Sequence, residues 1–311
     1  MWSENYAFMV NDAAHRLAIV CLLGRWTEDP RIWREFLMIG LPGERVVYHK
    51  AFGRAATKTV AAASLLSVEV IEPEREFRVQ FDGPMAEDTR AALLQRGTTP
   101  RPVRRCQFDF RMRGNAPVWD ISGHKNDASD IAGKMHVEQV GTVNGSLSYG
   151  AETFMIERAF GQRDHSRGIR IVTTFYRHCW AQGHFREANV TFNVYAMAVH
   201  GGTPMLHASV SKGEHRYPAT VHELNFMDGP QDGNVLYEFK LRSEIGEMAI
   251  RMTEVMSSLP KGFTSPWDVN VGAIPGYPAA MVYEEAVTWE WAGERGSGWS
   301  ERGFNPQPFP P

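Results

Sequence analysis

The sequence predicts an all-β protein built from antiparallel strands, with few helices. Three observations support this prediction: apolar and polar residues alternate in several short runs, turn-forming residues separate these runs, and stretches with helical spacing are rare. Alternation with a period of two is typical of a strand that buries one face. Many short strands joined by tight turns favour a sandwich or a barrel over βαβ units.

Four runs show the alternation most clearly. They are residues 77–82, 106–113, 235–242 and 248–253. Turn signals between the runs are Pro42-Gly43, Asp82-Gly83-Pro84, Asn144-Gly145, Gly201-Gly202, Asp228-Gly229-Pro230 and Asp232-Gly233. The best helical candidate is residues 85–95, where acidic residues precede an Ala- and Leu-rich stretch that ends before Gly97 and Pro100.

Two domains are expected from the length. The chain has 311 residues, more than the ~250 at which one hydrophobic core usually stops growing. Residues 113–133 are rich in Gly, Asn, Asp, Ser and Lys and show little periodicity, so we place the domain boundary there. The predicted domains are residues 1–120 and 130–311, each with enough strands for a barrel.

The charge balance bears on partners and location. The chain has 33 Lys and Arg against 36 Asp and Glu, a net charge of -3, which argues against broad electrostatic binding to nucleic acid. The apolar run from Leu17 to Leu23 is too short to span a bilayer and lacks the flanks of a signal peptide. We therefore expect a cytoplasmic protein with no integral membrane segment and no nucleic-acid partner. The sequence leaves the oligomeric state open.

Metal, nucleotide and disulfide chemistry find no support in the sequence. Cys21, Cys106 and Cys179 are widely spaced, which predicts buried free thiols rather than a disulfide framework or a zinc ribbon. His178 and His184 could join Cys179 at a metal, but adjacent His and Cys side chains point to opposite sides of a strand. Phosphate-binding, dinucleotide-binding, nucleophile-elbow and HExxH motifs are also missing. We predict no metal site.

The densest polar segment is Gly161-Gln162-Arg163-Asp164-His165-Ser166-Arg167-Gly168, between strand candidates at 152–158 and 169–180. At a strand junction, Asp164 and His165 could place an acid and an imidazole at the mouth or interior of a barrel. Partial desolvation would raise the pKa of the carboxyl group and make it a proton donor. The alternative is a capped turn in which Asp164 accepts backbone N–H bonds and a neighbouring arginine neutralises it. Spacing alone does not decide between the two.

Two further places offer carboxylates for catalysis. His136 and Glu138 lie two residues apart and share one face of a strand, so they form an acid/base pair opposite Asp164 or a solvated polar face. Glu285 shares parity with Trp289 and other large residues. A carboxylate among aromatic side chains is expected to be paired or to have a perturbed pKa. Alternatively, Glu285 lies at a frayed strand end and reaches water or an arginine.

One aromatic and polar set could line a ligand cavity. Between residues 176 and 184, the residues of one parity are Tyr176, His178, Trp180, Gln182 and His184. Parity places them on one face, and we take the first three as candidate substrate-binding residues, together with Trp289.

Arg163-Asp164-His165-Ser166 and Gly168 resemble the Asp-His signature of the AttH-like superfamily, which includes carotenoid 1,2-hydratases (hydroxyneurosporene synthases) and lipocalin-like Diels-Alderases. Arg167 stands where that signature usually has Trp. Residues 4–6 are similar to the opening of these proteins, and residues 296–301 to their closing strand, whose final Glu corresponds to Glu301. The resemblance adds Glu301 to the candidate substrate-binding residues; its alternative role is an inter-strand salt bridge.

The resemblance implies two lipocalin-like antiparallel β-barrel domains packed together, with a ligand cavity near their junction and the Asp-His motif in the C-terminal domain. It also implies chemistry without a cofactor on a hydrophobic small molecule. Hydrating an electron-rich alkene needs an acid that protonates carbon, a group that takes a proton from water, and aromatic faces near the cation.

The leading hypothesis is a lyase, a hydratase or dehydratase of an isoprenoid- or polyketide-like alkene, with Asp164 as the acid. His165 would orient Asp164 or handle water; its alternative role is a hydrogen bond to a neighbouring strand. A cyclase or isomerase, such as a Diels-Alderase-like pericyclase, and a non-catalytic carrier are the alternatives.

Overall fold

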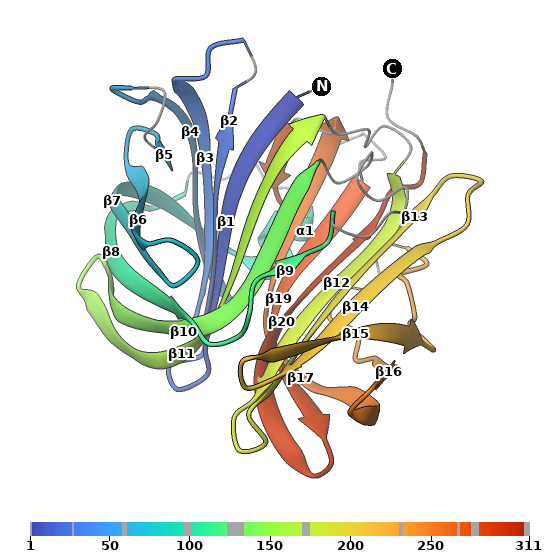
Figure 1. Ribbon diagram of the computed structural model, residues 1–311. Coiled ribbons are helices and arrows are strands. Elements are labelled where there is room, and N and C mark those ends of the chain that lie inside the picture. The colour runs from blue at the N-terminus through green and yellow to red at the C-terminus, as the bar shows by residue number, and fades with distance from the viewer. Residues whose placement is uncertain are drawn as a thin grey trace. The chain divides into compact units, whose positions relative to one another are not determined.

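The computed structural model describes residues 2–26, 28–57, 61–95, 101–122, 134–169, 175–229, 233–265, 268–274 and 280–307. In these residues the chain forms strands β1 to β20 and one six-residue helix, α1 (Arg90–Gln95). Figure 1 shows the strands gathered into two curved sheets. The prediction of an all-β protein with few helices is confirmed. The helix predicted at 85–95 is shorter than expected, because residues 85–89 continue a strand.

Each sheet belongs to a separate compact unit. The first unit consists of Met1–Asp88 and Thr99–Ile171, and the second of Thr89–Thr98 and Val172–Pro311. This division differs from the boundary predicted at 113–133, of which residues 123–133 lie outside the described part. Loop-like composition misled the prediction, because the strands on both sides of that segment pair within one sheet. The Asp-His motif therefore lies in the first unit and not in the C-terminal one.

The sheet of the first unit has eleven strands in the order β4-β3-β2-β1-β11-β10-β8-β7-β6-β5, with β9 beside β10 and an additional pairing of β4 with β7. The strands are β1 (Trp2–Asp12), β2 (Leu17–Arg25), β3 (Ile32–Leu41), β4 (Arg45–Arg54), β5 (Ala61–Ala62), β6 (Leu66–Glu72), β7 (Glu76–Thr89), β8 (Val103–Gly114), β9 (Trp119–Asp120), β10 (Met135–Tyr149) and β11 (Glu152–Ile169). The first strand of the chain thus pairs along the Asp-His motif in β11.

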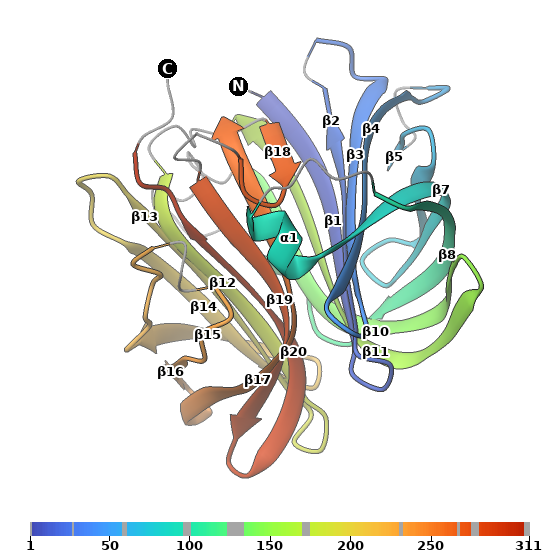
Figure 2. The same ribbon diagram turned by 180° about the vertical axis from the view of Figure 1, so that it is seen from behind.

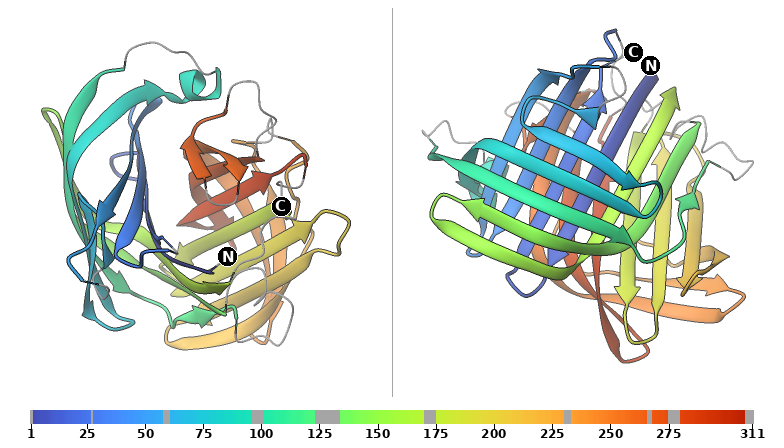
Figure 3. Two further views of the ribbon diagram at one scale, coloured as in Figure 1. Left: turned by 90° about the horizontal axis from the view of Figure 1, so that it is seen from above. Right: turned by 60° about the vertical axis from the view of Figure 1, so that its left-hand side comes forward.

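The sheet of the first unit folds over onto itself. In the right-hand panel of Figure 3, β6, β7 and β8 cross β1 to β4. One apolar cluster lies between these two groups of strands and contains, among others, Phe8, Leu37, Phe81 and Phe108. The alternating residues of the run at 77–82 are buried there as predicted. This cluster defines the inner face of the sheet.

The second unit has a nine-stranded sheet in the order β16-β15-β14-β13-β12-β20-β19-β17-β18, with an additional pairing of β16 with β17. The strands, which Figure 2 shows from behind, are β12 (Phe175–Phe185), β13 (Val190–Val199), β14 (Met205–Lys212), β15 (His215–His222), β16 (Glu238–Ser243), β17 (Gly246–Ser265), β18 (Asp268–Val271), β19 (Ala280–Trp291) and β20 (Glu294–Phe304). The described pairings in both sheets are antiparallel, which confirms the expected fold class.

Trp289 lies at the centre of the apolar cluster of the second unit. Its ring makes edge contacts with Phe192, Tyr237 and Phe239 at centroid distances of 5.6–5.7 Å, and its Nε1 donates to the carbonyl of Gln182 at 2.9 Å. These contacts place the odd-numbered residues of β19 on the inner face.

One sequence prediction is settled at the level of the fold. Cys21, Cys106 and Cys179 are free and buried, as expected. Burial raises the pKa of the Cys179 thiol to about 11, so the thiol stays protonated. Among the described residues no helix has the length and apolar character that crossing a membrane requires.

Candidate active site

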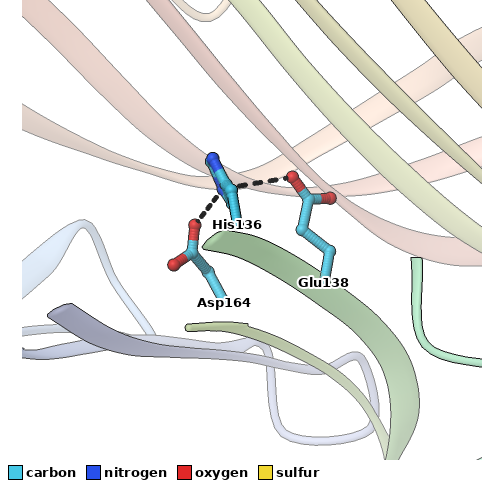
Figure 4. Close-up of side chains that lie close together, drawn as sticks. All are labelled: His136, Glu138 and Asp164. Atoms are coloured by element: carbon cyan, nitrogen blue, oxygen red, sulfur yellow. Dashed lines mark hydrogen bonds and ion pairs between the residues drawn. The ribbon is translucent and has the colours of Figure 1, made fainter. Parts of the chain in front are cut away.

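His136, Glu138 and Asp164 converge on one face of the first unit, as Figure 4 shows. Glu138 on β10 lies directly opposite Asp164 on β11, and His136 opposite Ser166. Opposed residues of antiparallel strands share a face, so register alone brings the three side chains together. His136 Nε2 lies 2.6 Å from Asp164 Oδ2 and 3.6 Å from Glu138 Oε1. We call these three residues the triad.

The triad lies on the face opposite the inner one, yet it is buried. On β1, Phe8 packs in the apolar cluster, whereas the adjacent Ala7 is the register partner of Asp164. Only 6% of the His136 side chain, 12% of Asp164 and none of Glu138 is exposed. A solvated polar face, the alternative weighed for His136 and Glu138, does not describe this environment. The structure instead brings the pair next to Asp164.

The segment 161–168 is not the strand junction or the capped turn that its composition predicts. It lies inside β11 and pairs with β1 on one side and β10 on the other. Two strand neighbours supply the backbone hydrogen bonds, so the Asp164 side chain is not needed to cap a turn. Asp164 is available for contacts with His136.

His165 lies on the inner face, away from Asp164. Successive side chains of a strand point to opposite faces. The His165 ring stacks on Tyr6 with 3.9 Å between ring centroids, and its Nε2 lies 3.2 Å from Glu4 Oε1. The prediction that His165 orients Asp164 is wrong for this reason, and His136 occupies that position instead.

An ion pair on the inner face of the first unit holds His165 in place. Arg25 Nε lies 2.6 Å from Glu4 Oε2, and the guanidinium group lies 4.4 Å from the centre of the Trp33 ring. Burial alone would raise the pKa of Glu4, but His165 and Arg25 outweigh it and lower that pKa. Glu4 is therefore a carboxylate whose charge is balanced locally.

The second unit contains a buried ionic network that sequence reasoning did not assemble. His178 Nε2 lies 2.7 Å from Glu301 Oε1, and Lys261 Nζ lies 3.0 Å from Glu301 Oε2. Lys261 also contacts Glu284, whose Oε2 accepts a 2.6 Å hydrogen bond from Trp299 Nε1. Glu284 and Glu301 are directly opposed on β19 and β20, so the pairing register of these strands would have predicted the network. The alternation of residues within one strand does not give that register.

The two glutamates of this network have pKa values that move apart. Burial and the neighbouring charge of Glu301 raise the pKa of Glu284 well above its usual range. Burial also opposes ionisation of Glu301, but Lys261 and His178 outweigh it and lower the pKa of Glu301. Of the two carboxyl groups, Glu284 is therefore the one that keeps a proton to higher pH. Glu301 makes the inter-strand salt bridge that the sequence left as its alternative role.

Glu285 lies on the inner face of the second unit and is fully buried. Its Oε1 accepts from the backbone N–H of Asn234 at 2.6 Å and from Ser258 Oγ at 3.2 Å. Its Oε2 lies 3.2 Å from Arg302 Nη2. Burial raises the pKa of Glu285, and Arg302 opposes the rise. The expectation of a paired and perturbed carboxylate is met, and the frayed strand end is excluded. Both oxygens are engaged, which favours a structural role over a catalytic one.

The candidate substrate-binding residues do not share one face. Trp180 is the register partner of Glu301 and lies on the outer face of the second unit, while Trp289 packs inside the apolar cluster. Tyr176 is half-buried beside a register shift, and its ring lies near that of His200 with centroids 4.6 Å apart. The structure thus joins Trp180, His178 and Glu301 but separates Trp289 from them.

The distances within the triad favour a hydrogen bond over metal coordination. The ligand atoms of the triad lie within 4.8 Å of one another, so these residues could be considered as a cation site. Two ligands of a tetrahedral zinc ion, each about 2.0–2.1 Å from the metal, would lie roughly 3.3 Å apart. His136 and Asp164 are closer, at 2.6 Å, which is the length of a charge-assisted hydrogen bond.

Comparison with known proteins places the chain in a family. A family described as a domain of unknown function (DUF7064) matches residues 1–306. The chain belongs to the DUF7064 family. No curated protein matches it in sequence.

Solved structures show which fold the family has. An AttH-like protein from Nitrosomonas europaea has a TM-score of 0.61 at 10% identity, covering 97% of this chain and 91% of that one. CghA bound to Sch210972 has a TM-score of 0.57 at 12% identity, covering 97% and 87%. Kievitone hydratase from Nectria haematococca has a TM-score of 0.50 at 12% identity, covering 97% and 88%. The AttH-like resemblance is confirmed at the level of the fold, which is two-part and lipocalin-like.

Proposed function

We propose that this DUF7064 protein is an enzyme that transfers protons through the triad to and from a hydrophobic small molecule. The reaction that fits best is hydration of an isoprenoid- or polyketide-like alkene, or the reverse dehydration, without a cofactor. The observation that carries the proposal is the 2.6 Å contact of His136 Nε2 with Asp164 Oδ2, with Glu138 Oε1 lying 3.6 Å from the same nitrogen. The similarity in fold to a protein named as a hydratase supports the reaction class.

Each member of the triad has a role that follows from its position. Asp164 is the most exposed of the three side chains and is the group that reaches substrate. His136 exchanges protons with Asp164 over their short hydrogen bond. Glu138 is fully buried and stabilises the imidazolium form of His136. Gln162 Nε2 lies 3.4 Å from Glu138 Oε2 and helps to orient that carboxylate.

The proton balance closes with water as the only other reactant. Asp164 donates a proton to one alkene carbon, which breaks the π bond, forms a C–H bond and leaves a carbocation on the other carbon. Water adds its oxygen to the cation and gives a proton to His136. His136 returns this proton to Asp164, which restores the starting state. The same steps in reverse convert a tertiary alcohol into an alkene and water.

The proposal is tested by replacing the acid while keeping its shape. Asp164→Asn should lower turnover by about 10²–10⁴-fold with ligand binding retained. Asp82→Asn is the matched control, because Asp82 belongs to the same unit and forms an exposed ion pair with Arg105. The assay supplies isoprenoid and polyketide alkenes in ¹⁸O-labelled water and detects labelled alcohols by mass spectrometry.

The same assay separates the alternatives. A cyclase or isomerase that works by holding a reactive conformer would form an unlabelled product, and Asp164→Asn would keep most of the rate. A carrier would return bound lipids from a cell extract unchanged, with no product from any candidate alkene. Either result would overturn the proposal of a hydratase.

A further inference from the structure

The outer face of the second unit carries a dense array of neutral polar side chains on β12, β13 and β14. Gln182 lies opposite Asn193, which lies opposite Ser209, and a second row contains His184, Thr191 and Ser211. The intervening residues, such as Ala181 and Phe192, point into the apolar cluster. We call the set of Trp180, Gln182, His184, Thr191, Asn193, Ser209 and Ser211 the polar face.

The polar face is buried but lacks hydrogen-bond partners. Gln182 has no exposed surface, and the exposure of Thr191, Asn193, Ser209 and Ser211 is 1–4%. Within the described residues, nothing pairs with either side-chain polar atom of Gln182. The same holds for Trp180 Nε1, Thr191 Oγ1, Asn193 Oδ1, Ser209 Oγ and Ser211 Oγ. Buried polar groups are hydrogen-bonded in the great majority of cases, and seven unpaired atoms on three adjacent strands are far above that expectation.

The chemistry of the polar face is neutral. Its members are amides, hydroxyls, an indole and one imidazole. Burial and the charge of Arg186 lower the pKa of His184 to about 4, so His184 is uncharged at neutral pH. Two indole rings border Gln182: Trp180 on the same strand, and Trp299, its register partner on β20. The array offers donors, acceptors and aromatic surfaces, without a formal charge among its seven members.

This combination limits what can bind. A hydrocarbon would leave the donors and acceptors unpaired, which is costly in a buried site. An anion or a cation would lose its hydration without gaining a counter-charge from the polar face. A hydroxyl group both donates and accepts, so it can pair with an amide, another hydroxyl or an indole N–H.

We propose that the polar face of the second unit binds an uncharged small molecule that carries several hydroxyl groups. The spacing of the strands sets the size of the bound molecule. Register partners on neighbouring strands lie about 4.5–5.5 Å apart. Two rows across three strands therefore match a molecule of about the size of a sugar ring. The site goes beyond the function proposed above, because binding here involves neither Asp164 nor a proton transfer.

Binding is measured on the full-length protein by isothermal titration calorimetry. The probes are n-octyl β-D-glucoside and n-decyl β-D-maltoside, both below their critical micelle concentrations, and catechin. The matched compounds are octanol, with one hydroxyl group, and octanoate, with a charge. At least one polyhydroxylated probe should bind saturably and at least tenfold more tightly than octanol and octanoate.

Gln182→Met is the decisive variant, because it keeps the length of the side chain and removes both unpaired polar atoms. It should weaken binding of the polyhydroxylated probe at least tenfold and raise the Tm of the free protein, since a desolvated polar group is replaced by an apolar one. If Gln182 had a purely structural role, Gln182→Met would lower the Tm of the free protein. Gln107→Met, at an exposed position of β8, is the control and should change neither quantity.

Ser209→Ala gives a second, smaller deletion and should weaken binding without unfolding the protein. Absence of saturable binding for all three probes, or unchanged affinity in Gln182→Met, would overturn the proposal and leave ordered water as the partner of these atoms. Asp164→Asn should bind the probes like the wild type. Loss of turnover and loss of binding therefore report on separate proposals.

Discussion

The two units repeat one architecture but use their faces differently. In each, a path of eight strands is linked at its ends by an additional pairing, β4 with β7 and β16 with β17. Each inner face buries one glutamate–arginine pair whose guanidinium lies over an aromatic ring, Arg25 over Trp33 at 4.4 Å and Arg302 over Tyr237 at 4.6 Å. The outer faces differ, since the first unit carries the compact triad and the second an ionic network beside an array of neutral polar groups.

The inner pairs show how the same motif gives opposite electrostatic outcomes. Glu4 has three cationic or potentially cationic neighbours, His165, Arg25 and Arg167, and its pKa falls despite burial. Glu285 has one, Arg302, and neutral donors otherwise, so burial wins and its pKa rises. The number of compensating charges, rather than the presence of an ion pair, sets the direction in which the pKa of a buried carboxyl group moves.

The largest expected effect separates the two His–carboxylate pairs. His136→Asn should lower turnover by about 10²–10⁴-fold, because it removes the group that exchanges protons with Asp164. His178→Asn removes the corresponding contact with Glu301 in the second unit and should change turnover less than about tenfold. Steady-state rates of both variants test this, and an equal loss in the two would assign the chemistry to both units.

The next effect compares the inner ion pairs. Arg302→Met leaves Glu285 buried without its cation and should reduce the free energy of unfolding by about 3–5 kcal/mol. Arg25→Met should cost no more than about 2 kcal/mol, because Glu4 keeps its contact with His165. Urea denaturation measures both values. Adding Glu285→Gln to Arg302→Met should restore part of the lost stability, and no restoration would contradict the pairing.

The pH dependence of stability should differ between the units. Because the pKa of Glu284 is raised in the folded state, that state holds a proton which the unfolded chain releases above pH 4.5, the ordinary pKa of a glutamate side chain. The contribution of Glu284 to the free energy of unfolding is complete below pH 4.5. It is lost as the pH rises towards the folded pKa, at up to about 1.4 kcal/mol per pH unit for one proton. Glu284→Gln should flatten this decline in denaturation curves recorded from about pH 5 to 8.

Glu4 should give a pH dependence of stability of the opposite sign. Because its folded pKa is lowered from 4.5, its contribution is present above that pH and is lost as the solution is acidified. Glu4→Gln should therefore reduce the loss of stability below pH 4.5 and leave the neutral range without a slope from this group. A slope at neutral pH that disappears in Glu4→Gln would contradict the assignment. Glu238→Gln, on an exposed strand position, is the control for both variants.

The smallest expected effect concerns metals. If the triad works through the short His136–Asp164 hydrogen bond, dialysis against EDTA should leave turnover unchanged, and added Zn²⁺ should inhibit by competing for the same three side chains. Metal analysis of the purified protein accompanies the assay. Activity that is lost with EDTA and recovered with one divalent cation would replace the acid/base triad by a metal centre.

Much of the candidate site is present in the sequence as local pattern. Once these residues lie in strands, a period of two places His136 and Glu138 on one face and Asp164 and His165 on opposite faces. The same rule groups Trp180, Gln182 and His184. Parity does not say which face is inner, however, and the adjacency of Asp164 and His165 in the chain does not bring their side chains together.

The sequence by itself determined the all-β class, the clearest alternating runs, the free thiols and the AttH-like signature, because these depend on residues close together in the chain. Only the tertiary structure decided the boundary between the units, the partner of Asp164 and the network around Lys261. Those depend on register between strands: Glu138 meets Asp164, and Glu284 meets Glu301, only when particular residues pair. Register is selected by burial of the whole inner face, which no single segment encodes.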